Sequence, residues 1–340
     1  QACITGCPDG YTTNERGRQT MKFVFLDVKT IGDDIDLSRF DLFGEVVKYP
    51  FSTQQEVPER IQDADVIIVN KIQVNEASIG AARNLKLVCV TATGTNNLDK
   101  EYLDKRGIAW RNVAGYSTES VAQHTFAMFF YLWEKLSFYD DYVKSGAYIK
   151  NRNFSYFSQR FYELSGKTWG IIGMGAIGQK VADIAEAFGC KVICYSASGR
   201  KYQLTSDRKQ VDFDTILQES DVLSIHAPLN SQTENLIDLQ ALKKMKPTSV
   251  LINVARGPIV NQEDLYTALT QNMIAGAGLD VLKQEPMAED NPLIKIQDSK
   301  KLLITPHIAW APVETRFRCR DEVVKNIEAF LAGEDRNRVY

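Results

Sequence analysis

Short apolar runs and amphipathic segments alternate along most of this chain. In residues 21–113, runs such as Phe23–Val28, Asp65–Val69 and Lys86–Thr91 have the length and composition of buried strands, and the segments between them have helical spacing. The alternation resumes after residue 167 with the runs Trp169–Ile172, Lys191–Tyr195, Asp221–His226, Ser249–Val254, Gly276–Val281 and Leu302–Ile304. Strands spaced by helices form parallel sheets with helices on both faces. The sequence therefore predicts an α/β protein with two doubly wound parallel-sheet domains.

The segment between these two regions is predicted to be one long helix, from Ser117 to about Gly146. Ser117 or Thr118 would cap it, and it is apolar almost all round near Phe126–Trp133. A surface helix shows a single apolar stripe, so this one is expected to be buried between domains or between subunits. We favour a homodimer built on this helix, because exposed apolar patches of this size mark interfaces. The alternative is burial wholly between the two domains of one chain.

Domain boundaries follow from the length of the chain and the position of its last helix. A chain of 340 residues suits two domains. The final predicted helix, Glu314–Leu331, lies beyond the second series of strands and can pack back on the first domain. We therefore expect one discontinuous domain, 21–116 and 311–340, and a second domain, 117–310. Residues 1–20 have no apolar period and are expected to be an extension outside the fold.

A glycine turn stands near the start of the second series. The run Lys167–Ile172 has the character of a buried strand, and Gly173, Gly175 and Gly178 follow it in G-x-G-x-x-G spacing, at the start of an amphipathic helix. In a dinucleotide site the first glycine permits the turn, the second lets a pyrophosphate approach the backbone, and the third lets the helix pack on the strand. The free N–H groups of the helix N-terminus would bind that pyrophosphate.

Composition narrows the classes of partner. The net charge of −3 gives no electrostatic case for nucleic acid, and the longest apolar run is far too short to span a membrane. The cysteines form no C-x-x-C pair, and Cys89, Cys190 and Cys194 lie in or beside apolar strands. Cys3 and Cys7 have no further ligands near them, so no metal is expected. We interpret the chain as a reduced cytoplasmic protein.

Three chemically useful residues follow the ends of the last three expected strands. Ligands of doubly wound sheets bind beyond these carboxyl ends, where the sequence has Arg256, Glu285 and His307. Of the three histidines, His124 sits in the apolar helix and is expected to be packed there, and His226 is expected to line the cofactor cleft. His307 is therefore the candidate for chemistry.

These residues suit hydride transfer to a 2-oxo acid. Reduction creates an alkoxide that needs a proton, which His307 can supply near neutral pH. Glu285 would hold the imidazole in one tautomer, and Arg256 can grip a carboxylate through two parallel hydrogen bonds. An isolated arginine or glutamate at a strand end is usually part of a surface ion pair, so the argument depends on their conjunction with the glycine turn.

The motifs around these residues resemble those of the D-isomer-specific 2-hydroxyacid dehydrogenases. The resemblance covers essentially residues 21–339 and is carried by Asn253-Val254-Ala255-Arg256-Gly257, Gly278-Leu279-Asp280-Val281 with Glu285-Pro286, Thr305-Pro306-His307-Ile308-Ala309-Trp310 and His226-Ala227-Pro228-Leu229. It implies a Rossmann dinucleotide-binding domain and a discontinuous flavodoxin-like substrate domain. It also implies that Arg256 orients the substrate, that His307 is the general acid/base, and that Glu285 is its partner.

The same resemblance implies a cofactor site and a substrate loop. The cofactor-binding residues would be Gly173, Met174, Gly175, Ala176, Ile177, Gly178, Ser196, Ser198, Arg200, His226, Ala227, Pro228, Val254, Ala255 and Asp280, the last at the nicotinamide carboxamide. The loop Ala92-Thr93-Gly94-Thr95 would offer backbone N–H groups to the substrate carboxylate, so that Thr93 and Gly94 join Arg256 and His307 as substrate-binding residues, with Asn70-Lys71 nearby. Phe154, Phe157 and residues 195–199 look most like the glycerate dehydrogenase (hydroxypyruvate reductase) branch.

One position departs from the dinucleotide fingerprint. An acidic residue that binds the ribose 2′-hydroxyl is expected at the end of the second strand, but Ser196 stands there, followed by Ser198, Arg200 and Lys201. Serine does not repel a 2′-phosphate and the basic pair suits one, so acceptance of NADPH is favoured and use of NADH stays open.

The predicted function is an NAD(P)-dependent D-2-hydroxyacid dehydrogenase. Its substrate pair would be hydroxypyruvate and D-glycerate, or glyoxylate and glycolate. D-lactate dehydrogenase is an alternative, and formate dehydrogenase is less favoured because, by resemblance, that branch has glutamine in place of Glu285. An alternative from another class is a non-enzymatic NAD(H)-sensing protein of the corepressor kind.

Overall fold

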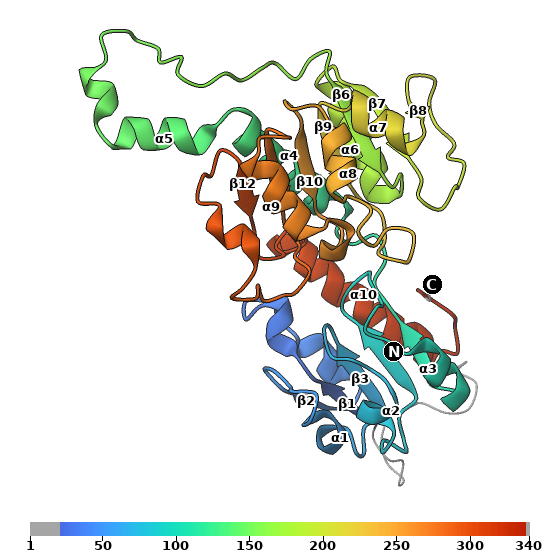
Figure 1. Ribbon diagram of the computed structural model, residues 1–340. Helices are drawn as coiled ribbons and strands as arrows, with labels where there is room; N and C mark the ends of the chain where they lie inside the picture. Colours follow the sequence, from blue (N-terminus) through green and yellow to red (C-terminus); the bar gives the residue numbers. More distant parts are fainter. Residues whose placement is uncertain (1–20, 338–340) are drawn as a thin grey trace, which may run out of the picture. The chain divides into compact units, whose positions relative to one another are not determined.

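The computed structural model describes residues 21–337 and divides into two units, each with its own sheet (Figure 1). Unit 1 comprises the described residues 21–116 and 313–337, and unit 2 comprises residues 117–312. Every strand pairing in the two sheets is parallel. The expected fold class is therefore confirmed. The predictions for residues 1–20, including Cys3 and Cys7, lie outside the described residues.

Unit 2 is built on a seven-stranded sheet in the order β12-β11-β10-β9-β6-β7-β8. Its strands are β6 (Thr168–Ile172), β7 (Lys191–Tyr195), β8 (Lys209–Gln210), β9 (Val222–Ile225), β10 (Val250–Asn253), β11 (Gly276–Leu279) and β12 (Leu302–Ile304). The sequence predicted six of these and missed β8, which is too short to produce an apolar run. The order reverses at β6, the position beyond which doubly wound sheets bind ligands.

Helices cover both faces of this sheet because its central strands are apolar on both sides. Val222 and Val250 pack in the cluster that contains α4 (Thr118–Trp133) and α6 (Ala176–Ala187). The alternate residues Leu223 and Leu251 pack in the opposite cluster. Its helices are α7 (Phe213–Glu219), α8 (Leu239–Lys244) and α9 (Gln262–Thr270), and the short 3₁₀ turns η4 (Gly257–Ile259) and η5 (Pro292–Lys295) lie beside them.

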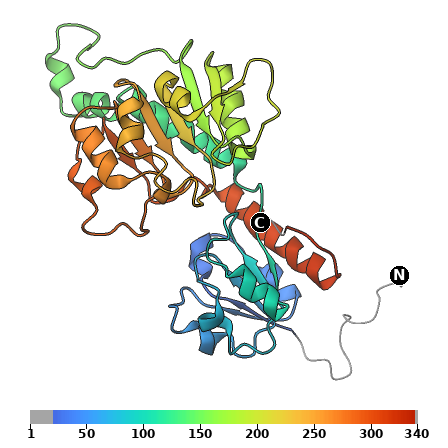
Figure 2. The ribbon, with the colours of Figure 1, turned by 45° about the vertical axis from the view of Figure 1, so that its right-hand side comes forward.

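Unit 1 has a five-stranded sheet in the order β2-β1-β3-β4-β5, which is the flavodoxin-like order. Its strands are β1 (Lys22–Phe25), β2 (Glu45–Lys48), β3 (Val66–Val69), β4 (Leu87–Val90) and β5 (Ala109–Arg111). Its helical elements are η1 (Val28–Ile31), η2 (Ser38–Leu42), α1 (Val57–Arg60), α2 (Glu76–Ile79), α3 (Lys100–Arg106) and α10 (Val313–Leu331). The last helix, α10, packs against β4 (Figure 2). It buries Cys319, Val323 and Ile327.

The helix between β3 and β4 is shorter than the helical spacing of residues 76–84 predicts. Asn75 and Ser78 cap its start reciprocally, but α2 ends at Ile79, and Gly80 follows it. Glycine carries a large entropic cost inside a helix, so the chain leaves the helix there.

The prediction of one long helix over Ser117–Gly146 is wrong. Lys135 takes a left-handed conformation with φ of 57°, which separates α4 from α5 (Leu136–Lys144). The apolar side chains of α4 pack on the sheet of the same unit, where the Phe126 ring lies 4.6 Å from the Trp169 ring. The burial of α4 therefore requires neither a second domain nor a second subunit.

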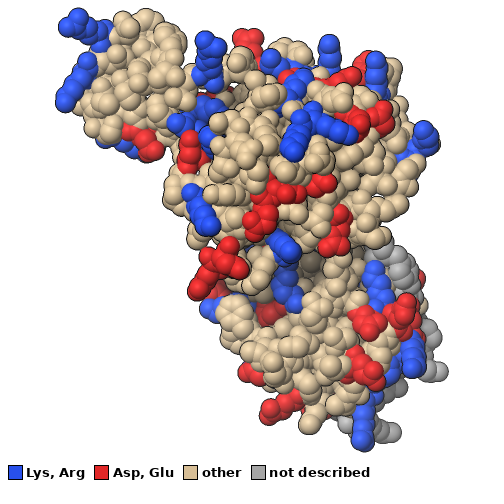
Figure 3. Space-filling model, in the orientation of Figure 1, with Lys and Arg blue, Asp and Glu red and all other residues tan. Residues whose placement is uncertain are grey.

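The segment after α4 forms an arm, residues 136–162, that projects from the body of unit 2 (Figures 1 and 2). It contains α5 and the 3₁₀ turn η3 (Ala147–Lys150), and none of the residues of either is buried. Ile149, Phe154 and Phe157 are 87%, 93% and 84% exposed. On the face drawn in Figure 3 the arm is largely uncharged, with lysine and arginine side chains at its outer end.

Candidate active site

The glycine turn after β6 has the shape that a dinucleotide requires. Gly173 has a φ of +92°, and a Cβ there would stand 2.7 Å from the Ala227 amide nitrogen. A Cβ on Gly178 would stand 2.2 Å from the Gly173 carbonyl oxygen. Gly175 meets nothing within 4 Å, so the first and third glycines serve internal packing and the second leaves an open approach. No side chain caps α6, whose first N–H groups can therefore bind an anion.

The strand next to this turn, β7, ends without a carboxylate. Ser196 is buried, and its Oγ lies 3.3 Å from the Oγ of Ser198. Arg200 and Lys201 are exposed, and their side chains form no ion pair with any residue of the described range 21–337. The end of β7 therefore carries hydroxyl groups in place of a carboxylate, with two cations in the adjoining loop.

His226 follows β9 and packs beside the glycine turn. Its Nε2 lies 3.0 Å from Ser224 Oγ, and its buried Nδ1 has no hydrogen-bond partner among residues 21–337. Burial lowers the pKa of His226 to about 3, so the ring is neutral at physiological pH. His226 can therefore line a binding site but is a poor proton donor.

Glu285 and His307 form the charged pair of the site. The Nδ1 atom of His307 lies 2.7 Å from Glu285 Oε2, and Glu285 Oε1 accepts the Leu282 amide N–H at 2.9 Å. An ionised carboxylate only accepts hydrogen bonds, so Nδ1 carries a proton and Nε2 is left to exchange one with a ligand. Both side chains keep partial exposure, 25% for His307 and 32% for Glu285. The pair has the geometry of a general acid/base with its orienting partner.

Asp280 anchors the loop that carries His307. Its buried carboxylate accepts hydrogen bonds from Thr305 Oγ1 (2.6 Å) and from the amides of Ile308 (2.8 Å) and Ala309 (2.9 Å). The Asp280 carbonyl also accepts the amide of His307, which has a left-handed φ of 56°. Burial alone would raise the pKa of Asp280, but hydrogen bonds from the His124 side chain, from Thr305 and from the two amides outweigh it and hold that pKa below its ordinary value.

His124 is part of this network, which the sequence did not indicate. Its Nε2 lies 3.0 Å from Thr305 Oγ1 and 3.4 Å from Asp280 Oδ1. A histidine inside an apolar helix was expected to be packed only. The missed signal is the pairing of two residues 181 positions apart, which no local pattern contains.

Arg256 follows β10 in a turn that Asn253 holds. The buried Asn253 side chain donates to the Arg256 carbonyl and accepts the Ala255 amide, both at 3.0 Å. The Arg256 guanidinium is partly exposed and donates to the Ala255 carbonyl at 2.7 Å. Because β10, β11 and β12 are neighbours in the sheet, Arg256, Glu285 and His307 follow three adjacent strand ends.

Thr93 and Gly94 belong to unit 1, in the loop after β4. The carbonyl and hydroxyl groups of Thr93 are bound to the segment after β5: Thr93 O accepts Asn112 Nδ2, and Thr93 Oγ1 donates to Val113 O. Asn70 and Lys71, after β3, donate their amides to the buried carboxylate of Asp27. Among the candidate site residues, those of unit 1 contribute main-chain groups held by hydrogen bonds, and those of unit 2 contribute the ionisable side chains Arg256, Glu285 and His307.

Two classes of feature are absent from residues 21–337. No group of three or more histidine, cysteine or acidic residues there is arranged to hold a metal ion. Within the same range, none of the helices combines the length and the apolar character needed to cross a membrane.

Comparisons with known proteins identify the family of the chain. The model of the family "D-isomer specific 2-hydroxyacid dehydrogenase, NAD binding domain" matches residues 126–309. The chain is 37% identical over 321 residues to a glycerate dehydrogenase of Methylorubrum extorquens, which covers 94% of this chain and 99% of that protein.

Two solved structures are also similar. One is an acyclic imino acid reductase in complex with NADPH and D-Arg, with a TM-score of 0.83 and 31% identity, covering 94% of this chain and 100% of that one. The other is the D-lactate dehydrogenase of Aquifex aeolicus complexed with NAD and lactic acid, with a TM-score of 0.81 and 30% identity, covering 92% and 96%. They hold different forms of the nicotinamide cofactor.

Proposed function

This chain belongs to the D-isomer-specific 2-hydroxyacid dehydrogenases and is an oxidoreductase of CH–OH groups; from that premise we propose that it reduces hydroxypyruvate to D-glycerate, or glyoxylate to glycolate. The name of the M. extorquens relative supports the first pair. The likeness to a D-lactate dehydrogenase keeps pyruvate as an alternative substrate.

The observation that carries the proposal is the 2.7 Å contact between Glu285 and His307. A bound reduced nicotinamide would supply the hydride. Protonated His307 then donates its Nε2 proton to the oxygen of the reduced carbonyl, and in the reverse direction neutral Nε2 removes the hydroxyl proton. Glu285 stabilises the protonated ring in both directions, and its carboxylate accepts the proton of His307 Nδ1 as a hydrogen bond.

Arg256 and the Thr93–Gly94 loop bind the substrate carboxylate in this proposal. The guanidinium offers two parallel donors and polarises the adjacent carbonyl, and the loop offers main-chain N–H groups. The main chain at Gly175 and at the first turn of α6 would hold the cofactor pyrophosphate. The open approach at Gly175 and the uncapped helix support this assignment.

We further propose that the cofactor is NADPH as well as NADH. Ser196 carries no charge that would repel a 2′-phosphate, and Arg200 and Lys201 are unpaired among residues 21–337. His226, Ala227, Pro228, Val254 and Ala255 would line the cofactor, and Asp280 would stand near the nicotinamide.

A homodimer is also part of the proposal, and its interface would be the arm, residues 136–162, in place of α4. The exposed aromatic side chains of the arm form a surface that a second copy can cover. The four described cysteines are all free, which supports a reducing, cytoplasmic setting.

The test is a panel of hydroxypyruvate, glyoxylate and pyruvate, each assayed with NADH and with NADPH. The expected result is the highest kcat/KM with hydroxypyruvate or glyoxylate. Cofactor binding without turnover of any 2-oxo acid would favour the nucleotide-sensing alternative instead.

A further inference from the structure

The loop after β4 has three successive carbonyl groups that each accept a hydrogen bond. Thr91 O accepts the Cys319 thiol at 3.4 Å, Ala92 O accepts the Val113 amide at 3.0 Å, and Thr93 O accepts Asn112 Nδ2 at 2.7 Å. All of these contacts lie within unit 1. The donors come from α10 and from the segment after β5.

In each of these peptides the N–H group points away from the donor that binds the carbonyl. In a trans peptide the C=O and N–H bonds are antiparallel, so a carbonyl directed at Asn112 aims the Gly94 N–H away from it. The amides of Thr93 and Gly94 have no hydrogen-bond partner among residues 21–337. Two adjacent, unsatisfied N–H groups make a receptor for a carboxylate or another anion.

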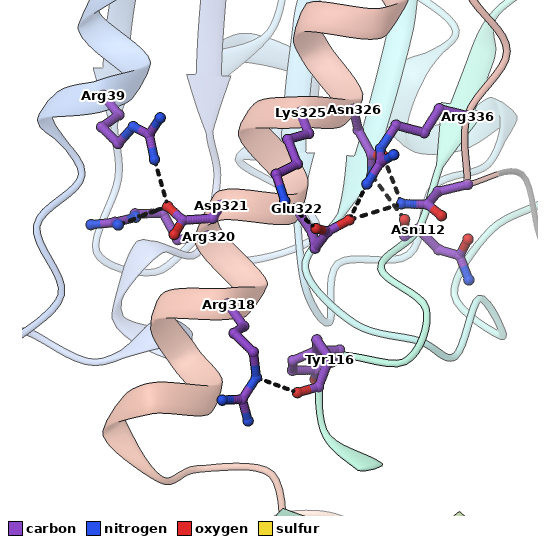
Figure 4. Close-up of polar contacts among 11 residues, drawn as sticks. Arg39, Asn112, Tyr116, Arg318, Arg320, Asp321, Glu322, Lys325, Asn326 and Arg336 are labelled. Atoms are coloured by element: carbon purple, nitrogen blue, oxygen red, sulfur yellow. Dashed lines mark hydrogen bonds and ion pairs between the residues drawn. The ribbon is translucent and has the colours of Figure 1, made fainter. Parts of the chain in front are cut away.

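Asn112 is held firmly enough to set this direction. The residue is 0% exposed, its amide donates to the Asn337 carbonyl at 3.0 Å, and its carbonyl accepts Asn326 Nδ2 at 2.9 Å. Asn337 Nδ2 in turn donates to Asn326 Oδ1 at 2.9 Å. Figure 4 shows Asn112 and Asn326 meeting beside α10, with Glu322 and Arg336 at the edge of the same cluster.

We propose that Asn112 is a positioning residue that aims the Gly94 N–H at the substrate carboxylate. The inference rests on the proposed function, because it assumes that this loop binds the 2-oxo acid. Asn112 touches no substrate itself. It acts by fixing the peptide between Thr93 and Gly94, which would otherwise be able to rotate and turn a carbonyl oxygen toward the carboxylate.

The decisive variant is Asn112→Asp, which keeps the shape of the side chain but replaces the donor to Thr93 O with an oxygen. The KM for the 2-oxo acid should rise about tenfold or more while kcat changes less than about threefold, because binding of a charged group is lost in ground and transition state alike. The Kd of NADH should stay unchanged. The Kd of oxamate, an unreactive analogue of a 2-oxo acid, should rise with KM in the presence of NADH.

Asn326→Asp is the matched control. It also removes one buried amide donor to a main-chain carbonyl in the same cluster, but it leaves the contact between Asn112 and Thr93 in place. Its KM should stay within about threefold of the parent, even if both variants lower the urea midpoint equally. If Asn112→Asp does not fold, Asn112→Ala removes the donor without adding a charge and should give the same KM pattern.

Equal KM changes in the Asn112 and Asn326 variants, or no change in either, would overturn the positioning role. The outcome is distinguishable from failure of the proposed function itself. If the proposed function itself fails, the parent protein will bind NADH but will neither reduce a 2-oxo acid nor bind oxamate.

Discussion

The two sheets of this protein end in two different kinds of site. The carboxyl edge of the unit 2 sheet carries ionisable side chains that are already paired, such as His307 with Glu285. The corresponding edge of the unit 1 sheet carries main-chain groups that buried polar side chains hold in place, such as the Thr93 carbonyl on Asn112. Proton transfer needs a titratable group, whereas recognition of a carboxylate needs only fixed donors, so the two edges have different chemical capabilities.

Two buried carboxylates, one in each unit, have pKa values that shift in opposite directions. Asp27 in unit 1 accepts the amides of Asn70 and Lys71, but burial dominates and raises its pKa. Asp280 in unit 2 is also buried, yet its pKa is lowered, because side-chain donors from His124 and Thr305 add to the main-chain donors. The two buried carboxylates therefore differ in the direction of their pKa shift, and only Asp280 also accepts side-chain hydrogen bonds.

The largest effect is expected at the proton donor of unit 2. His307→Ala should lower kcat by roughly 10²- to 10⁴-fold, the usual contribution of a general acid/base. The Kd of NADH should be nearly unchanged, because the glycine turn is untouched. Stopped-flow reduction and a fluorescence titration of NADH measure the two quantities. Near-normal turnover would remove the functional contrast between the two edges.

Replacing the cationic grip should cost less than losing the proton donor. Arg256→Lys keeps the charge but loses the two-pronged contact, so KM for the 2-oxo acid should rise about 10- to 100-fold with a smaller change in kcat. Steady-state kinetics with hydroxypyruvate or glyoxylate give the split. A loss confined to kcat would place Arg256 in the chemical step rather than in carboxylate binding.

Cofactor choice should depend on unit 2 alone. Ser196→Asp places a carboxylate where a 2′-phosphate would bind, and it should cut kcat/KM for NADPH by at least about tenfold, roughly 1.4 kcal/mol. The value for NADH and the KM for the 2-oxo acid should be spared. If the parent enzyme does not use NADPH, Arg200 and Lys201 are solvated loop charges, and the hypothesis that they bind the 2′-phosphate is wrong.

Glu285→Gln should move the pH profile of the reduction toward lower pH. A neutral amide stabilises the protonated imidazole less than a carboxylate does, so the active protonated form is lost at a lower pH. The pH dependence of kcat/KM measures the shift. An unchanged profile would show that Glu285 does not act through His307, despite the short contact.

The smallest effects concern stability. The pKa of Asp280 is below its ordinary value of 3.8, so its contribution is complete above that pH and is lost as the pH falls through the folded-state pKa. The pKa of Asp27 in the folded state is above 3.8, so the folded protein takes up this proton at a higher pH than the unfolded chain does. The free energy of unfolding contributed by Asp27 therefore rises as the pH falls toward 3.8. Urea midpoints of Asp280→Asn and Asp27→Asn against the parent, from about pH 6 to about pH 3, should therefore diverge with opposite slopes. Slopes of the same sign would contradict the contrast.

The sequence by itself determined the alternating strands and helices, the glycine turn and the three candidate residues that follow the ends of β10, β11 and β12. Parallel strands such as β9 and β10 are buried on both faces, so their apolar runs are visible locally. Residues just beyond strand ends must lie at one edge, which is why Arg256, Glu285 and His307 could be chosen without a structure. Their roles as carried over by resemblance stay predictions that the variants above test.

Tertiary structure alone decided the break at Lys135, the place of α4 against its own sheet, and the supporting side chains of the site. His124 meets Thr305 across 181 positions, and Asn326 meets Asn112 across 214. Such contacts depend on the register and packing of whole elements, and neither residue type nor spacing along the chain marks them in advance. An apolar helix likewise has the same pattern whether a subunit, a domain or its own sheet covers it, so only the packed structure distinguishes the three.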